Sequence, residues 1–342
     1  MSHISPRVVH AVAIAVFAVG AASGCSHLKL GLVDASVRKP SNVAVYFTVE
    51  TNQGAPVPNL LPPNFRIYED GRPVSLLESR LTILQPEVAA IHYTLLLIDM
   101  SGSVVGSGDV PTLVTAASSF ADRVGPYQKV AVYLFDGRPH IDQVVPFGGN
   151  VRGGISSLLN YRSKDPSTNL NGAVIEGVRA LQKQMDASPV PLRFGTLVVF
   201  TDGTDRAARA KPEDAQTALD EAGFDSYVIA VGAETDEKEL KAIGRSGAFT
   251  SRNPTDIAAG FDNIARAIEG YSKRYYLLTY CTPARAGEHD LEIEAVSGDM
   301  TGRLSHHFKA DGFGPNCDPY QKPAFDVRRP RQQAPGAAQA SR

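Results

Sequence analysis

Hydrophobic and polar positions alternate in two different ways along the chain. Between residues 91 and 272, short apolar runs of strand length alternate with segments in which apolar residues recur at helical spacing. The apolar runs are 95–98, 129–135, 197–200 and 226–231, and the helical spacing is found at 112–124, 168–185, 212–222, 236–243 and 256–268. Alternating strands and helices of these lengths predict an α/β fold, with a mostly parallel sheet and helices on both of its faces.

The segments on either side of this region carry strand patterns only. Before it, they are 43–49, a hairpin at 64–74 with an Asp70-Gly71 turn, and 79–84; after it, they are 274–281, 290–296 and 302–309. A few strands alone cannot close a core. We therefore expect residues 41–90 and 273–317 to pair into one small antiparallel β-sandwich into which the α/β domain, residues 91–272, is inserted.

The remaining segments are expected to lie outside these two units. Residues 25–40 are predicted to be a tether. Residues 318–342 are rich in Pro, Gln, Ala and Arg and have little to bury, which predicts a flexible tail.

Polar residues follow the first apolar run of the α/β region directly. Asp99, Ser101 and Ser103 come at alternate positions after it, Thr168 lies in a turn-rich loop, and Asp202 follows a second apolar run. Ligands of open α/β sheets collect at the carboxyl ends of the strands, and Mg²⁺ prefers oxygen ligands. Asp and Ser after a strand are also ordinary turn and N-cap residues, and for Asp99, Ser101 and Ser103 alone that alternative stays open.

The pattern Asp99-x-Ser101-x-Ser103, then Thr168, then Asp202 resembles the metal-ion-dependent adhesion site of von Willebrand factor A (vWA) or integrin I-like domains. The resemblance covers about half of the chain and implies a Rossmann-like vWA fold. It also implies that the three hydroxyls face the cation and that the two carboxylates act largely through bound waters. The cation would be Mg²⁺, or else Mn²⁺ or Ca²⁺, and its open position would take an acidic side chain of a partner protein.

The N-terminus carries a targeting pattern. Arg7 precedes an apolar stretch at 8–22, and small residues then lead to Cys25, which is typical of a secretory signal peptide over residues 1–24. The stretch is short for a membrane span. Cys25 resembles the lipidated first residue of bacterial lipoproteins, although Ala22 stands where that family usually has Leu. Lipidation at Cys25 would anchor the protein in the bacterial cell envelope, and Ser26 favours the outer membrane; a plain secreted protein or an uncleaved anchor is the alternative.

The other two cysteines and the net charge indicate which kinds of bond and ligand to expect. In an exported protein, Cys281 and Cys317 form a disulfide more readily than a metal site, because zinc needs more ligands than the sequence gathers there. The formal net charge of -2 gives no basis for nucleic-acid binding, which needs a basic face.

Three classes of function fit these observations. The first is a lipid-anchored, metal-dependent module that binds a protein partner through an exposed Asp or Glu. The second is a structural scaffold in which the cation only ties loops together. The third, a metal-dependent hydrolase, is less favoured because no His or Glu base adjoins the predicted strand ends and because His306 and His307 lie in a predicted strand of the flank. Asp109, Asp136 and Asp205 are predicted to be solvated loop acids.

Overall fold

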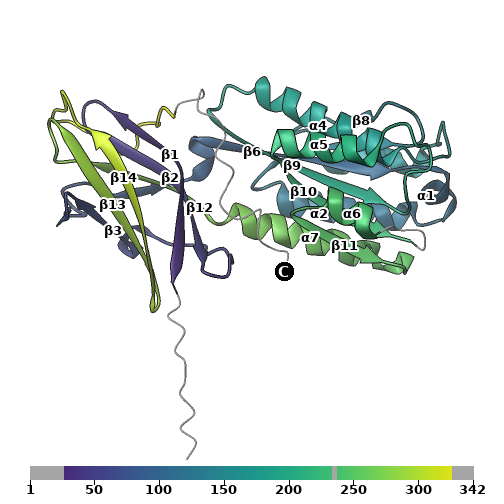
Figure 1. The fold of residues 1–342 in the computed structure, drawn as a ribbon, viewed down its shortest axis with the longest axis horizontal. Helices are drawn as coiled ribbons and strands as arrows, with labels where there is room; N and C mark the ends of the chain where they lie inside the picture. Colours follow the sequence, from purple (N-terminus) through teal and green to yellow (C-terminus); the bar gives the residue numbers. More distant parts are fainter. Residues whose placement is uncertain (1–26, 233–236, 326–342) are drawn as a thin grey trace, which may run out of the picture.

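A six-stranded sheet lies at the centre of the larger unit in the computed structural model, which describes residues 27–232 and 237–325 (Figure 1). The strand order is β11-β10-β9-β6-β7-β8, and only the pair β7–β8 is antiparallel. The strands are β6 (Ala90–Asp99), β7 (Lys129–Phe135), β8 (Asp142–Val145), β9 (Leu192–Thr201), β10 (Asp225–Val231) and β11 (Gly247–Ser251). The predicted vWA-type sheet is therefore confirmed.

Helices cover both faces of this sheet. They are α1 (Gly102–Gly106), α2 (Val110–Val124), α3 (Val151–Ile155), α4 (Leu170–Asp186), α5 (Pro212–Ala222), α6 (Glu237–Ile243) and α7 (Ile257–Ser272), with 3-10 turns at Ser156–Asn160 and Pro254–Asp256. Within the described residues, no helix is long and apolar enough to cross a membrane.

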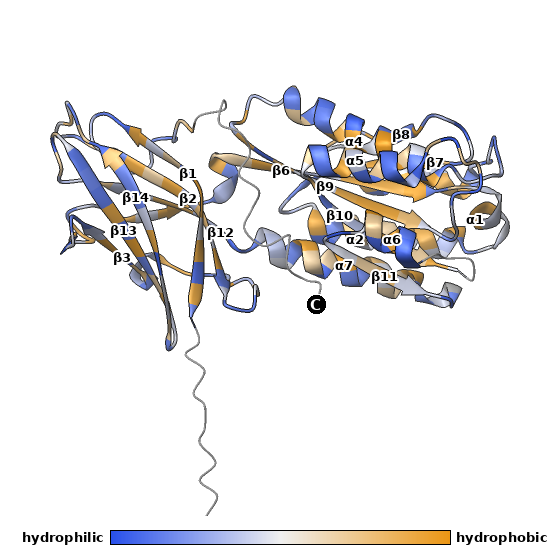
Figure 2. Cartoon of the chain, viewed as in Figure 1, coloured by the Kyte–Doolittle hydropathy of each residue, from blue (hydrophilic) through white to orange (hydrophobic). Residues whose placement is uncertain are grey.

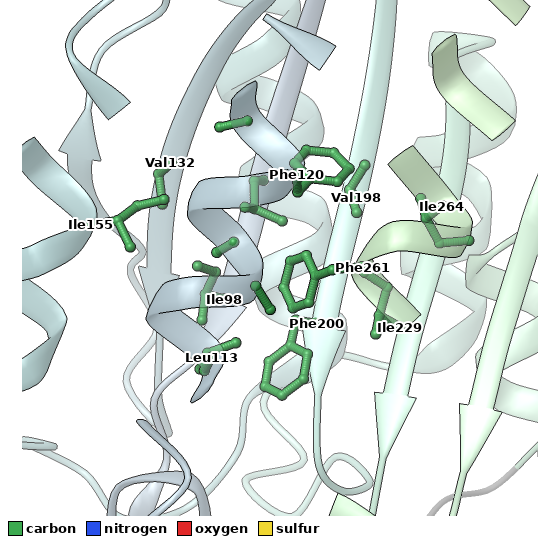
Figure 3. Close-up of a cluster of buried hydrophobic side chains, with 14 of the residues drawn as sticks. Ile98, Leu113, Phe120, Val132, Ile155, Val198, Phe200, Ile229, Phe261 and Ile264 are labelled. Carbon is green, nitrogen blue, oxygen red and sulfur yellow. The ribbon is translucent and has the colours of Figure 1, made fainter. Parts of the chain in front are cut away.

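Each face of the sheet has its own hydrophobic core. Helices α2 and α7 pack on one face, where the ring of Phe261 stacks on Phe200 at 5.6 Å and meets Phe120 edge-on at 6.0 Å (Figure 3). Helices α4, α5 and α6 pack on the other face. Because both faces are covered, the central strands are hydrophobic almost throughout, as Figure 2 shows for β9 and β10. This burial fixes the positions of the strand ends.

The smaller unit is an antiparallel sandwich of two four-stranded sheets, ordered β1-β2-β12-β5 and β14-β13-β3-β4. Its strands are β1 (Leu28–Arg38), β2 (Asn42–Thr51), β3 (Phe65–Glu69), β4 (Arg72–Pro73), β5 (Thr82–Leu84), β12 (Tyr275–Cys281), β13 (Glu288–Ser297) and β14 (Met300–Lys309), with 3-10 turns at Pro62–Asn64 and Pro86–Val88. Asp70 and Gly71 both have positive φ, 51° and 73°, as the predicted tight hairpin turn requires. The two flanks thus share one core, as predicted.

The predicted tether at residues 25–40 is wrong over most of its length. Residues Leu28–Arg38 form strand β1, which pairs with β2 along its whole length and has Leu28 and Ser36 buried. Its inward positions include polar residues, and the pairing register shifts between Leu32 and Asp34. These two features hide the alternation by which a strand is normally found in a sequence.

The predicted flexible tail is also wrong at its beginning. Residues 318–325 lie against the sandwich, where Thr279 donates a hydrogen bond to the carbonyl of Pro319 at 2.7 Å and Ser36 donates one to the carbonyl of Ala324 at 3.0 Å. Phe325 is buried. The segment begins next to the disulfide between Cys281 and Cys317, which is present as predicted. The rest of the predicted tail, 326–342, lies outside the described residues.

A buried ion pair lies where helix α7 continues into strand β12. Arg274 and Glu50 form this pair, and their side chains are 7% and 4% exposed. The guanidinium of Arg274 also lies 3.5 Å from the centre of the Tyr271 ring. Around the pair, Tyr46 of the sandwich and Phe194 of the α/β unit belong to one hydrophobic cluster. The pair and the cluster together join the two units.

Candidate functional site: a cluster of oxygen ligands at the sheet edge

The predicted ligands lie at the carboxyl edge of the sheet. Strands β6 and β9 are parallel neighbours, with Ile98 opposite Phe200, so Asp99 at the end of β6 lies beside Thr201 at the end of β9. Asp202 follows directly. The adjacency is a consequence of parallel pairing, because parallel strands end at the same edge.

A chain of hydrogen bonds connects four of these residues. Asp99 accepts one bond from the backbone N–H of Ser101 at 2.9 Å and one from the hydroxyl of Thr201 at 2.8 Å. The hydroxyls of Ser101 and Ser103 lie 3.2 Å apart, and Ser103 donates to Asp202 at 3.0 Å. The two carboxylates are thus linked through Ser101, which uses its backbone N–H and its hydroxyl, and through the hydroxyl of Ser103.

The loop that carries Thr168 is held against the same edge. Gly102 donates its backbone N–H to the carbonyl of Pro166 at 2.9 Å, and a Cβ at Gly102 would come within 2.7 Å of the Pro166 side chain. This close approach requires glycine. Thr168 itself accepts, through its carbonyl, the N–H groups of Arg206 and Ala207, both at 2.9 Å.

A cleft opens beside this cluster. It has a volume of about 310 Å³ and is lined in part by Ser103, Thr168 and Asp202. Asp99 and Ser101 lie beneath with no exposed surface. The structure therefore places all five predicted ligands at one edge, three of them on the wall of a cleft.

Burial disfavours the charged forms of the two carboxylates and so raises their pKa values. It raises the pKa of Asp99 to about 7, with a further contribution from the charge of Asp202, while the hydrogen bonds from Ser101 and Thr201 act in the opposite direction. Burial also raises the pKa of Asp202, against the hydrogen bond from Ser103. A positive charge between these groups would relieve both effects.

The set of donor atoms fits a hard divalent cation. Two carboxylates and three hydroxyls supply oxygen only, which suits Mg²⁺, Mn²⁺ or Ca²⁺ better than a soft metal. Among the described residues, no group of three or more His, Cys, Asp or Glu side chains is placed to hold a metal ion. The hydroxyls would therefore be essential members of the ligand set here.

The prediction of a solvated loop acid at Asp136 is wrong. The residue has no exposed surface. It accepts bonds from the Arg138 side chain at 2.9 Å and from the backbone N–H of Lys164 at 3.1 Å, which fixes the start of the loop leading to Thr168. Asp136 follows the apolar run of β7 just as Asp99 follows that of β6, so the strand-end signal was present.

Two further residues support the site from nearby positions. Asp205 accepts the backbone N–H of Asn171 at 2.8 Å, at the first turn of α4, and that of Ala208 at the same distance. Thr201, which holds Asp99, was not singled out from the sequence, because a threonine inside an apolar strand gives no local signal of this role.

Comparisons with known proteins agree with this architecture. Residues 95–263 match the family model described as the von Willebrand factor type A domain. A search of curated proteins finds no significant match.

Among solved structures, three similar ones illustrate the range. A von Willebrand factor type A protein from Catenulispora acidiphila has 12% identity and a TM-score of 0.44, over 85% of this chain and 75% of that one. Proximal thread matrix protein 1 from the mussel byssus has 13% identity and a TM-score of 0.45, over 52% of this chain and 48% of that one, so the alignment spans about half of its length. Manganese-loaded TRAP protein from Plasmodium vivax has 10% identity and a TM-score of 0.43, over 72% of this chain and 99% of that one.

Proposed function

Because residues 95–263 form a von Willebrand factor type A domain, we propose that this protein is a metal-dependent protein-binding module of the bacterial cell envelope. The cation, Mg²⁺ or alternatively Mn²⁺ or Ca²⁺, is held at the carboxyl edge of the sheet and completes its shell with an Asp or Glu of a partner protein. The proposed ligands are Asp99, Ser101, Ser103, Thr168 and Asp202.

The observation that carries the proposal is the gathering of these five residues at one edge of the sheet, with three of them on the wall of a cleft. Ser103, Thr168 and Asp202 line it, so a cation bound there faces solvent. When bound, the cation supplies a centre of positive charge that accepts oxygen ligands. Two protein carboxylates do not complete the shell of such an ion, and a third carboxylate from outside is a favourable addition.

Attachment to the envelope is the second part of the proposal. Cys25, the expected site of lipidation, lies outside the described residues. The described chain begins beside it, at His27, and enters the sandwich through β1. Helix α1 and the site lie at the opposite end of the long axis of the molecule (Figure 1). An anchor at Cys25 would therefore hold the sandwich and leave the site accessible to a partner.

Cation affinity is expected to rise with pH and to level off above about pH 7. The pKa of Asp99 is raised to about 7 in the cation-free protein, so below that pH the cation must displace a proton, and the dissociation constant should increase about tenfold for each pH unit lost. Calorimetric Mg²⁺ titrations from about pH 5.5 to about pH 8.5 test this. An affinity independent of pH over that range would contradict it.

The raised pKa of Asp99 also determines how the stability of the cation-free protein changes with pH. Because folding raises the pKa of this acid above its ordinary value, the cation-free fold binds more protons than the unfolded chain between about pH 4 and pH 7. The free energy of unfolding of the cation-free protein should therefore decrease as pH rises through that window.

The test of the function is capture of an envelope protein in Mg²⁺, followed by release with a chelator. Asp99→Ala should abolish capture, whereas Asp299→Asn, an exposed carboxylate in the turn between β13 and β14, should leave it intact. Capture that persists in chelator while the cation raises only the melting temperature would favour the structural scaffold. Hydrolysis of a phosphoester or peptide that is lost in Asp202→Ala would favour an enzyme.

A further inference from the structure

We propose that residues 205–209, named here the clasp, position Thr168 for the cation, and that Arg209 is the side chain on which this positioning depends. The inference rests on the proposed function and adds residues that are not among the five proposed ligands. The clasp follows Asp202 in the chain and is bonded to the loop of residues 163–169, which carries Thr168. It joins these two parts of the site without a cation.

The clasp holds Thr168 by its backbone. The N–H groups of Arg206 and Ala207 both donate to the carbonyl oxygen of Thr168, at 2.9 Å. These bonds do not involve the hydroxyl of Thr168, which is the proposed ligand. Because threonine is branched at Cβ, fixing its backbone leaves few rotamers for that hydroxyl. The clasp therefore limits where the hydroxyl can point.

Asp205 extends the contact to the start of helix α4. One of its carboxylate oxygens accepts the N–H of Asn171 at 2.8 Å, and the other accepts the N–H of Ala208 at the same distance. The second bond closes a turn inside the clasp, in which Ala208 has a φ of 48°. A residue other than glycine is uncommon in this left-handed region and persists where its surroundings hold it. Asp205 thus fixes the shape of the clasp as well as its attachment.

Arg209 ties the other end of the clasp to the same loop. Its Nε donates to the carbonyl oxygen of Gly137 at 2.5 Å, and its Nη2 donates to the carboxylate of Asp165 at 3.1 Å. The other carboxylate oxygen of Asp165 accepts the N–H of Ser167, also at 3.1 Å. A guanidinium is a rigid fork, so one side chain holds both groups in a fixed relation. The residue before Thr168 is thus connected, through Asp165, to Arg209.

The ion pair of Arg209 is open to solvent. The side chain of Arg209 is 45% exposed and that of Asp165 is 27% exposed, and ion pairs this exposed contribute little to the stability of a whole fold. The effect of the pair is local, because it orders the loop that presents Thr168. Replacing a residue that supports a metal ligand in this way typically lowers metal affinity about 10- to 100-fold.

The charge of Arg209 acts in the opposite direction to its bonds. A guanidinium near a cation repels it, so loss of the charge alone would strengthen Mg²⁺ binding. Loss of the bonds would weaken binding, because the cation would have to order the loop as it binds. The sign of the change in the dissociation constant therefore distinguishes a positioning role from a purely electrostatic one.

Calorimetric Mg²⁺ titration of the full protein and of Arg209→Ala tests the inference. We expect the dissociation constant to rise about 10-fold, with a melting temperature in chelator close to that of the wild type. Arg209→Lys keeps the charge but cannot make both bonds of the fork, so it should also bind Mg²⁺ more weakly. In chelator, hydrogen exchange at residues 163–169 should be faster in both variants than in the wild type.

Arg245→Ala is the matched control. Arg245 also binds a carboxylate, that of Asp220, and donates to the carbonyl oxygen of Ala242. It lies beside Ser226, near the start of β10, at the edge of the sheet opposite the proposed cation site. Its replacement removes the same kinds of bond. It should leave both the Mg²⁺ affinity and the hydrogen exchange of the loop that carries Thr168 unchanged.

The outcomes separate this inference from the proposed function. A dissociation constant that is unchanged or lower in Arg209→Ala, or hydrogen exchange that is unchanged, would overturn the inference and leave the proposed function standing. An equal loss of affinity in Arg245→Ala would do the same, because it would show a general effect of losing an arginine. A wild-type protein that does not bind Mg²⁺ would count against both. If Arg209→Ala fails to fold, Arg209→Lys decides the question.

Discussion

Asp99→Asn is expected to abolish Mg²⁺ binding and, in chelator at about pH 8, to make the protein more stable than the wild type. Asp99 is fully buried, and burial with the nearby charge of Asp202 raises its pKa to about 7, so its ionised form destabilises the cation-free fold. An amide of the same shape removes that charge. It offers only one acceptor oxygen to the two donors, Ser101 and Thr201, which reduces the gain to roughly 1–2 kcal/mol.

Thermal unfolding of both proteins in chelator and in Mg²⁺ measures this trade-off between binding and stability. The wild type should gain stability with Mg²⁺ in proportion to the logarithm of its concentration, and Asp99→Asn should not respond. Asp299→Asn should behave like the wild type. An Asp99→Asn protein that is less stable in chelator and still responds to Mg²⁺ would show that Asp99 is not a ligand.

Arg274→Met is expected to destabilise the protein by about 3–5 kcal/mol, because it leaves Glu50 buried without a partner charge. This loss of stability should be larger than the loss expected from removing only the contact between the Arg274 guanidinium and the Tyr271 ring. Urea unfolding followed by circular dichroism gives the free energy of unfolding.

The double variant Glu50→Leu, Arg274→Met is the matched control. Replacing both members of a buried pair by apolar residues is often close to neutral, so the double variant should recover most of the stability that the single variant loses. Equal instability of the single and double variants would show that the unpaired charge is not the cause of the loss. The cause would then be the loss of packing in the hydrophobic cluster between the two units.

The gathering of the five proposed ligands at one edge of the sheet could be predicted because its information is local. Asp99, Ser101 and Ser103 lie within five positions after an apolar run, and Asp202 follows a second run of the same kind. Parallel strands that are buried on both faces must end at one edge, which brings the two sets together without further information. The α/β fold could be predicted for the same reason, since its strands and helices each carry their own hydrophobic period.

Strand β1 could not be predicted because its inward positions are partly polar. Asp34 and Ser36 are buried, and Ser36 is satisfied by the backbone of Ala324, which is 288 positions away in the sequence. The same contact orders residues 318–325, which have no hydrophobic period of their own. Two segments that look unstructured separately thus order each other, and such a long-range pairing leaves no local signal.

Asp136 shows a second limit on predicting the role of a residue from the sequence. Its place after β7 marked it as a strand-end acid, but its role depends on the side chain of Arg138 and the backbone of Lys164, to which it is bonded. The partners of a buried carboxylate decide whether it binds a cation or holds a loop, and the sequence does not specify those partners.

Anomalous diffraction from crystals of the protein soaked in Mn²⁺ locates the cation and its ligands. We expect one strong manganese peak at the carboxyl edge of β6 and β9, bonded to the hydroxyls of Ser101, Ser103 and Thr168, with Asp99 and Asp202 in contact directly or through water. The peak should be absent in Asp99→Asn crystals treated in the same way. No peak at this edge, or a peak only at other carboxylates, would show that these five residues do not form a cation site.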